Sequence, residues 1–220
     1  MAGWFVSRRM QRIVCVAAAV LSLAAGAPSA ADEDRDSRVS LCLLIDSAAS
    51  ANSLPAEFLT RVIWRESRFK PLAVGPATGG GARAEGIAQF MPGTAAERAL
   101  ADPFDPVEAL PKAAAFLRDL RDDFGNLGLA AAAYNAGPQR VRGWLAGTRS
   151  MPDETRHYVR AITGRGVEEW ARGAVADEAG HRPDQKNCTQ TLAALNAPPA
   201  AFALELERRV DVAIGKPWGV

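Results

Sequence analysis

Apolar residues recur at helical spacing along most of this chain of 220 residues, and the pattern predicts an all-α fold. The first predicted helix runs from Leu54 to Glu66, with Ser53 as its N-cap and Lys70-Pro71 as its stop. Its large apolar side chains fall on one face, which would point into the core: Phe58, Leu59, Val62 and Ile63.

Two further helix starts carry the capping-box pattern, in which an N-cap acceptor is followed three residues later by glutamate. Thr94 with Glu97 and Asp105 with Glu108 both fit this pattern, so we expect a helix to begin at each of them. The second of these helices should end at Gly125. It carries an apolar stripe made of Leu110, Ala113, Phe116, Leu117, Leu120 and Phe124.

The stretch from Leu127 to Asn135 is apolar on all sides and rich in alanine, which predicts a buried central helix. Gly137-Pro138 breaks this helix, a short helix follows at Val141 to Leu145, and Asp153 to Thr163 forms another. Strand signals are almost absent. Only residues 74–90 leave room for an irregular segment or a small hairpin.

The first 31 residues have the layout of a secretory signal peptide. Three arginines precede an uncharged run whose apolar heart spans residues 13–25, and Ser29-Ala30-Ala31 then leads into acidic residues. The apolar heart is shorter than the about 20 residues that a membrane-spanning helix needs, so we expect cleavage after Ala31 and export to the periplasm. The predicted segments are the signal peptide at 1–31, a main domain at 32–165, and a helical C-terminal extension at 166–220 with helices over 189–196 and 200–214.

Charge and cysteine content narrow the class of protein. The 26 Lys and Arg and 25 Asp and Glu residues become 23 and 25 when the three arginines leave with the signal peptide, a formal charge of −2. A nucleic-acid-binding domain is expected to be basic, so this balance disfavours that class. Of the three cysteines, Cys15 lies in the signal peptide and leaves Cys42 and Cys188. An even pair in an oxidising compartment predicts one disulfide, with two unrelated buried thiols as the alternative.

Three short motifs follow one another in the main domain and together indicate a sugar-cleaving site. They are Glu66-Ser67, residues 86–95 (Gly-Ile-Ala-Gln-Phe-Met-Pro-Gly-Thr-Ala) and residues 132–138 (Ala-Ala-Tyr-Asn-Ala-Gly-Pro). Breaking a glycosidic bond needs a carboxylic acid that stays protonated near neutral pH, which burial among apolar groups can provide. Glu66 follows an apolar turn and lies at the negative end of a helix dipole, so it is the candidate acid.

In order and spacing, these motifs resemble the three signatures of the soluble lytic transglycosylase domain, a relative of goose-type lysozyme, over about residues 55–165. The resemblance implies a helical lysozyme-like fold with a glycan cleft. It implies cleavage of peptidoglycan between N-acetylmuramic acid and N-acetylglucosamine, with release of a 1,6-anhydromuramyl end and with no cofactor. One carboxylate then suffices, because the substrate's N-acetyl group assists departure and its C6 hydroxyl attacks, with Glu66 as acid and then base.

Five further residues are candidate substrate contacts. Gln89 would offer amide hydrogen bonds to the glycan or to the candidate acid, and Tyr134 and Asn135 would present a phenol and an amide to the same place. Tyr134 would either orient the acid through its hydroxyl or serve in the core. Ser67 would bond the N-acetyl group of the substrate or cap the helix end. Tyr158 matches a position where members of the family often have another cleft tyrosine.

Two features differ from the family pattern. Ala88 stands where many members have methionine, and the link over 74–85 is longer than usual and contains three consecutive glycines, which would form a mobile flap. No convincing second carboxylate accompanies the candidate acid. Glu85 is the nearest, and Asp102 and Asp105 have turn and cap positions.

We expect no metal site, because His157 and His181 lie far apart and have no companions at ligand spacing. Two other functions stay open: a hydrolytic lysozyme acting on the same bond, and a non-catalytic glycan-binding or secretion-assembly module. The expected partner is the peptidoglycan glycan strand, bound by a monomer. The sequence leaves open an association with secretion or conjugation machinery of the cell envelope, and cleavage within strands or from their ends.

Overall fold

The structure, a computed structural model, describes residues 30–173 and 186–196, and this part of the chain contains helices and no strand. The helices are α1 (Ala30–Ala51), α2 (Ala56–Ser67), α3 (Pro92–Glu97), α4 (Pro106–Phe124), α5 (Leu127–Ala136), α6 (Pro138–Leu145), α7 (Asp153–Thr163), α8 (Val167–Ala171) and α9 (Cys188–Asn196). The all-α class is therefore confirmed. The predicted helix over 200–214, His181 and nearly all of the predicted signal peptide lie outside the described residues.

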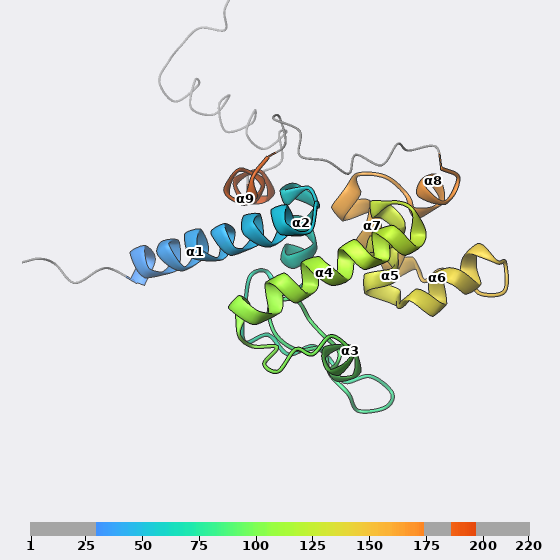
Figure 1. Cartoon of the computed structure of the whole chain (residues 1–220), viewed down its shortest axis with the longest axis horizontal. Coiled ribbons are helices and arrows are strands. Elements are labelled where there is room, and N and C mark those ends of the chain that lie inside the picture. The colour runs from blue at the N-terminus through green and yellow to red at the C-terminus, as the bar shows by residue number, and fades with distance from the viewer. Residues whose placement is uncertain (1–29, 174–185, 197–220) are drawn as a thin grey trace, which may run out of the picture.

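Helix α5 is the centre of the fold and packs against α4, α6, α7 and α8 (Figure 1). Every residue from Leu127 to Ala133 is buried, as its apolar surface on all sides predicted. Small residues let the neighbouring helices approach closely. A Cβ on Gly128 would lie 2.0 Å from the ring of Trp170 in α8. Trp170 is thus a core residue and is 7% exposed.

Helix α2 carries the candidate acid and joins the two sides of the molecule. It packs against α1 and α9 on one side and against α7 on the other, while α4 runs from α1 to α5 (Figure 1). Its predicted apolar face is buried through Phe58, Leu59, Val62 and Ile63. Burial of that face, more than helix propensity, fixes which way the last turn of α2 points.

Two helix starts differ from the prediction. Helix α1 was not expected, and the turn that closes it includes Ser53 at φ 51, so the N-cap of α2 is Pro55 instead. Helix α3 begins at Pro92 and ends at Glu97, so Thr94 lies inside it and does not start it. Proline is well suited to the first position of a helix, since its backbone has no N–H to leave unbonded.

Asp105 caps α4 as predicted, because its carboxylate accepts a hydrogen bond from the N–H of Val107 at 2.9 Å. The second half of the capping box is not formed. Glu108 instead accepts from the N–H groups of Ala101 and Asp102, at 2.9 and 3.1 Å. It thereby ties the preceding turn to the start of α4.

The C-terminal helix packs back on the domain. Cys42 of α1 and Cys188 of α9 form the predicted disulfide, and Asp46 accepts a hydrogen bond from the N–H of Cys188 at 2.9 Å. Helix α9 contacts both α1 and α2. Across residues 30–173 and 186–196, no helix combines the length and the apolar character that crossing a membrane requires.

Candidate active site

Glu66 lies in the last turn of α2, on the face that points into the fold. It follows Val62 by four residues and Ile63 by three, and both are fully buried, so the three side chains share one side of the helix. The helix ends at once, where Arg68 has a left-handed backbone (φ 54) and Phe69 does too (φ 61). Such backbone is unfavourable for residues other than glycine, and it tends to occur at functional sites.

Burial raises the pKa of Glu66 from 4.5 to about 7. Three neighbours adjust this value. The hydrogen bond from Tyr158 and the positive charge of Arg65 lower the pKa, and the negative charge of Glu154 raises it. The protonated and ionised forms are therefore both well populated near neutral pH, which suits a group that gives and then accepts a proton.

The hydrogen bond to Glu66 comes from α7. Tyr158 of that helix is 4% exposed and donates its hydroxyl proton to Oε1 of Glu66. Burial raises the pKa of Tyr158 well above its usual value, and the neighbouring carboxylate raises it further. The phenol therefore stays protonated and remains a donor whichever form Glu66 takes.

Tyr134 lies near Glu66 but bonds elsewhere. Its hydroxyl donates to the carbonyl oxygen of Ala88 at 2.7 Å, and its ring packs against Phe90 and Phe116. Burial raises the pKa of Tyr134, and the charge of Glu66 adds to that effect. The contacts match the core role considered for this residue. The alternative expectation was that the hydroxyl of Tyr134 would orient the acid. In the structure, the hydroxyl that bonds Glu66 belongs to Tyr158.

The glycine loop, which we define as residues 86–91, is held against α2 by Ser67. This serine is 7% exposed, and its hydroxyl donates to the carbonyl oxygen of Ile87 at 2.7 Å. The proton of the hydroxyl therefore goes to the loop and not to the helix end, and a bond to the N-acetyl group of the substrate, in which the hydroxyl oxygen would accept, stays a prediction. Gly86 has φ 76, and a Cβ there would lie 1.7 Å from the carbonyl oxygen of Pro103.

Gln89 directs both hydrogens of its amide to loop backbone. Its Nε2 donates to the carbonyl oxygens of Gly86 at 2.9 Å and Ala73 at 3.2 Å. These two residues flank the long link over 74–85, so the side chain of Gln89 holds the two ends of that link together. Val74 also pairs with Glu85 there, which matches the predicted small hairpin. Both N–H groups of the amide are thus used by loop backbone, so the predicted hydrogen bond from Gln89 to the glycan would have to use Oε1 as an acceptor.

Asn135, near the end of α5, is partly exposed and accepts a hydrogen bond through Oδ1 from the hydroxyl of Thr155 at 2.8 Å. Thr155 belongs to α7, three residues before Tyr158. Sequence reasoning missed both Thr155 and Glu154. The available signal was helical spacing, since both residues lie about one turn before Tyr158 on a helix that was itself predicted.

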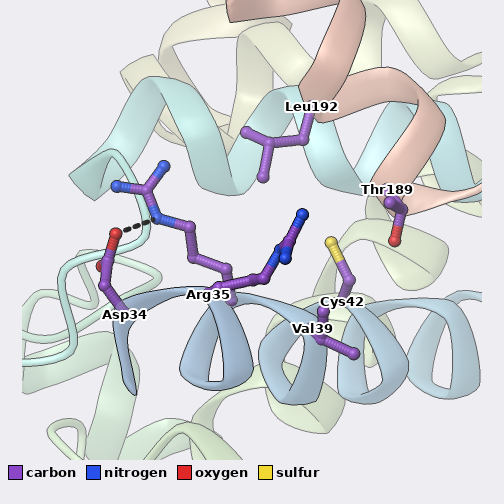
Figure 2. Close-up of a pocket in the computed structure, with 7 residues that line it drawn as sticks. Asp34, Arg35, Val39, Cys42, Thr189 and Leu192 are labelled. Atoms are coloured by element: carbon purple, nitrogen blue, oxygen red, sulfur yellow. Dashed lines mark ion pairs between the residues drawn. The ribbon is translucent and has the colours of Figure 1, made fainter. Parts of the chain in front are cut away.

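A separate pocket of about 340 Å³ lies between the N-terminal half of α1 and α9 (Figure 2). It is lined by Asp34, Arg35, Arg38, Val39, Cys42, Thr189 and Leu192. None of them is a predicted site residue. In the part of the chain that the structure describes, no three His, Cys, Asp or Glu side chains come together as a metal site would require.

A helical domain with a partly buried carboxyl, a pKa near neutrality and a tyrosine hydroxyl on it defines a general acid–base site. The chain belongs to the transglycosylase SLT domain family, whose family model matches residues 43–156, just over half of the chain. The resemblance seen in the three motifs is thereby confirmed. The matched range contains Glu66, the glycine loop and Asn135, while Tyr158 lies two residues beyond it.

Two curated proteins illustrate the relationship. A transglycosylase of Enterobacteria phage PRD1 is 28% identical over 120 residues, which cover 54% of this chain and 43% of the phage protein. The soluble lytic murein transglycosylase of Escherichia coli K12 is 29% identical over 135 residues, covering 51% of this chain and 20% of the relative. The chain thus spans less than half the length of either protein.

Two solved structures are also similar. The 70 kDa soluble lytic transglycosylase SLT70 of Escherichia coli has 25% identity and a TM-score of 0.48, covering 66% of this chain and 26% of that one. An inactive mutant of the lytic transglycosylase Slt from Pseudomonas aeruginosa has 30% identity and a TM-score of 0.46, covering 66% and 25%. The family assignment rests on the match over residues 43–156 and not on these overlaps.

Proposed function

We propose that the chain is a peptidoglycan lytic transglycosylase. It cleaves the β-1,4 bond between N-acetylmuramic acid and N-acetylglucosamine without adding water, and it leaves 1,6-anhydro-N-acetylmuramic acid ends. The observation that carries the proposal is the pKa of about 7 that burial gives Glu66. A carboxyl with the ordinary pKa of 4.5 would be almost fully ionised at neutral pH and would have no proton to give.

In the first step, Glu66 protonates the bridging oxygen while the N-acetyl group of the muramic acid assists departure of the leaving sugar. Oε1 accepts a hydrogen bond from the hydroxyl of Tyr158, so the proton that is transferred to the substrate is carried by Oε2. The same hydrogen bond restrains rotation of the carboxyl. Tyr158 therefore contributes through orientation, and its own proton stays in place.

In the second step, the carboxylate of Glu66 takes the proton of the C6 hydroxyl as that oxygen attacks C1 and closes the anhydro ring. The proton lost in the first step is thus recovered, and one carboxyl serves both steps. The hydrogen bond from Tyr158 and the charge of Arg65 both favour the ionised form, so they stabilise Glu66 between the steps.

This reaction requires no second carboxylate, and the contacts of the other candidates agree with that. Asp102 accepts from the N–H of Phe104 at 2.8 Å, and Asp105 caps α4, so both have local structural bonds. The negative charge of Glu154 acts on Glu66 by raising its pKa, which favours the protonated form. In the substrate-binding role, Asn135 offers its amide and Gln89 its amide oxygen.

Comparison of Glu66→Gln with the unchanged chain on purified murein tests the proposal. The substitution keeps the size of the side chain and removes its acid, so we expect turbidity clearing to fall by about 10²- to 10⁴-fold. Glu85→Gln is the matched control, since Glu85 is a partly buried carboxylate next to the glycine loop, and it should retain activity. Full activity in Glu66→Gln would exclude this mechanism.

Mass spectrometry of the released sugars separates the remaining possibilities. Anhydro ends are expected. Ends heavier by one water would identify a hydrolytic lysozyme, and murein binding without clearing by the unchanged chain would identify a glycan-binding module. Loss of activity in Glu85→Gln would indicate a mechanism with two carboxylates.

We also propose that the protein acts as a monomer in the periplasm. The layout of residues 1–31 and the disulfide between Cys42 and Cys188 support export, because such bonds persist in oxidising compartments. N-terminal sequencing of the protein from a periplasmic fraction should start at Asp32. A chain that retains its first residues and stays in the cytosolic fraction would contradict export.

A further inference from the structure

We infer that Thr155 is a positioning residue that fixes the amide of Asn135 with its N–H groups toward the glycan. The hydroxyl of Thr155 lies 2.8 Å from Oδ1 of Asn135 and donates to it. Thr155 is 2% exposed, whereas Asn135 is partly exposed. Because the amide oxygen is tied to a buried group, Nδ2 is the end of the amide that faces outward. The inference rests on the proposed function, which supplies the glycan as ligand.

The position of Thr155 in its helix explains why its proton is available. Three other helical threonines donate to the carbonyl four residues before them: Thr60 to Ala56 at 2.7 Å, Thr163 to Val159 at 2.9 Å and Thr191 to Asn187 at 2.8 Å. Asn187 lies directly before α9, whereas Thr155 is the third residue of α7, whose N-cap is Pro152, so the residue four before Thr155 lies beyond the cap. Its hydroxyl is therefore directed across to α5. A hydroxyl has one proton, so this bond decides which atom of the amide is the acceptor.

As a consequence, two side-chain amides of the site offer different atoms to the ligand. Gln89 gives its N–H groups to the loop and keeps an oxygen for the ligand, whereas Asn135 gives its oxygen to Thr155 and keeps two N–H groups. Asn135 should therefore recognise an acceptor oxygen on an N-acetylated sugar, such as the acetamido carbonyl. Without Thr155, either end of the amide can face outward, and the share of correctly oriented protein falls.

The test is a double-mutant cycle on sugar binding, carried out in the Glu66→Gln background so that nothing is cleaved. Thr155→Val keeps the shape and removes the donor, while Thr155→Ser keeps the donor. We expect Thr155→Val to weaken binding of an N-acetylglucosamine oligomer about two- to tenfold by calorimetry, and Thr155→Ser to stay close to the parent. In an Asn135→Ala background, Thr155→Val should cause no further loss.

Three results would overturn the inference. They are an equal loss from Thr155→Val with and without Asn135, a loss from Thr155→Ser as large as that from Thr155→Val, and an absence of oligomer binding in the parent. A further readout uses the chain with Glu66 intact. Thr155→Val should leave the pH midpoint of murein clearing unchanged, because Thr155 acts on Asn135 and not on the acid, and a shifted midpoint contradicts this. Failure of the unchanged chain, with both Glu66 and Thr155 in place, to clear murein would contradict the proposed function alone, since the binding cycle does not need cleavage.

Discussion

The two sides of the site are built in different ways. Helix α7 reaches it with hydrogen bonds between side chains, from Tyr158 to Glu66 and from Thr155 to Asn135. The glycine loop is instead the acceptor of side-chain hydrogen bonds through its own backbone, with the carbonyl of Ile87 bonded by Ser67 and that of Ala88 by Tyr134. Side chains of α7 therefore bond the functional side chains directly, while the glycine loop is backbone that other residues hold in place.

This comparison separates two residues of the same type. Tyr158 and Tyr134 both lie close enough to Glu66 for its charge to raise their pKa. Only Tyr158 bonds the carboxyl, and Tyr134 bonds the loop. Substitution of Tyr158 should therefore change the protonation of Glu66, and substitutions on the loop side should change stability.

The largest effect is expected on the loop side, for Gly86→Ala. The new Cβ would lie 1.7 Å from the carbonyl oxygen of Pro103, and the backbone has φ 76, so backbone must move. We expect the free energy of unfolding in urea to fall by about 3 kcal/mol or more.

Gly80→Ala is the matched control for Gly86→Ala. A Cβ on Gly80 meets nothing within 4 Å, so Gly80→Ala should change the free energy of unfolding by no more than about 1 kcal/mol in the same urea series. Equal effects at the two glycines would show that the loop is not held where the structure has it.

The second prediction concerns the stability of Glu66→Gln as a function of pH. The folded pKa of about 7 lies above the ordinary value of 4.5, so folding favours the protonated acid. This contribution is fully present below pH 4.5 and is lost as the pH rises through about 7. Glutamine does not ionise, so the variant should gain stability over the parent as the pH rises, by about 3 kcal/mol above neutrality.

Urea unfolding of both proteins would measure this change at about pH 4 and about pH 8, which lie on either side of the titration. A stability difference that does not depend on pH would mean that Glu66 titrates normally. Tyr158 of α7 would then bond a carboxyl whose pKa is ordinary.

The third prediction is for Tyr158→Phe. Its hydrogen bond lowers the pKa of Glu66, so its removal should raise that pKa and move the alkaline limb of murein clearing to higher pH. Loss of a bond to a charged group should also reduce kcat by about tenfold. An unmoved limb would contradict the assignment of this hydroxyl to the acid.

The elements that the sequence predicted correctly are those with a local cause. Helix α5 is apolar on every side, and α7 runs over Asp153–Thr163 as its spacing predicted. Helix α1 was missed because the residues from 34 to 40 are all exposed and its buried positions begin at Cys42. The apolar side of α1 becomes evident only when α2, α4 and α9 lie on it.

The same distinction applies to the site. Glu66 could be chosen from the sequence because it follows an apolar turn at the end of one helix and belongs to the first of the three motifs. The bonds of Ser67 and Gln89 could not be predicted, because their acceptors are backbone carbonyls of a loop. Any residue type presents the same carbonyl, so its direction depends on tertiary structure and leaves no signal in the sequence.

The smallest effect is expected for Tyr134→Phe, and it is the sharpest test of the comparison. The substitution leaves the carbonyl of Ala88 without its partner, which should lower the free energy of unfolding by about 1 kcal/mol. Because Tyr134 does not bond the acid, the pH limb of murein clearing should stay where it is in the parent. If this limb moves as far as in Tyr158→Phe, then the loop side also sets the protonation of Glu66, and the two sides of the site act as one hydrogen-bonded unit.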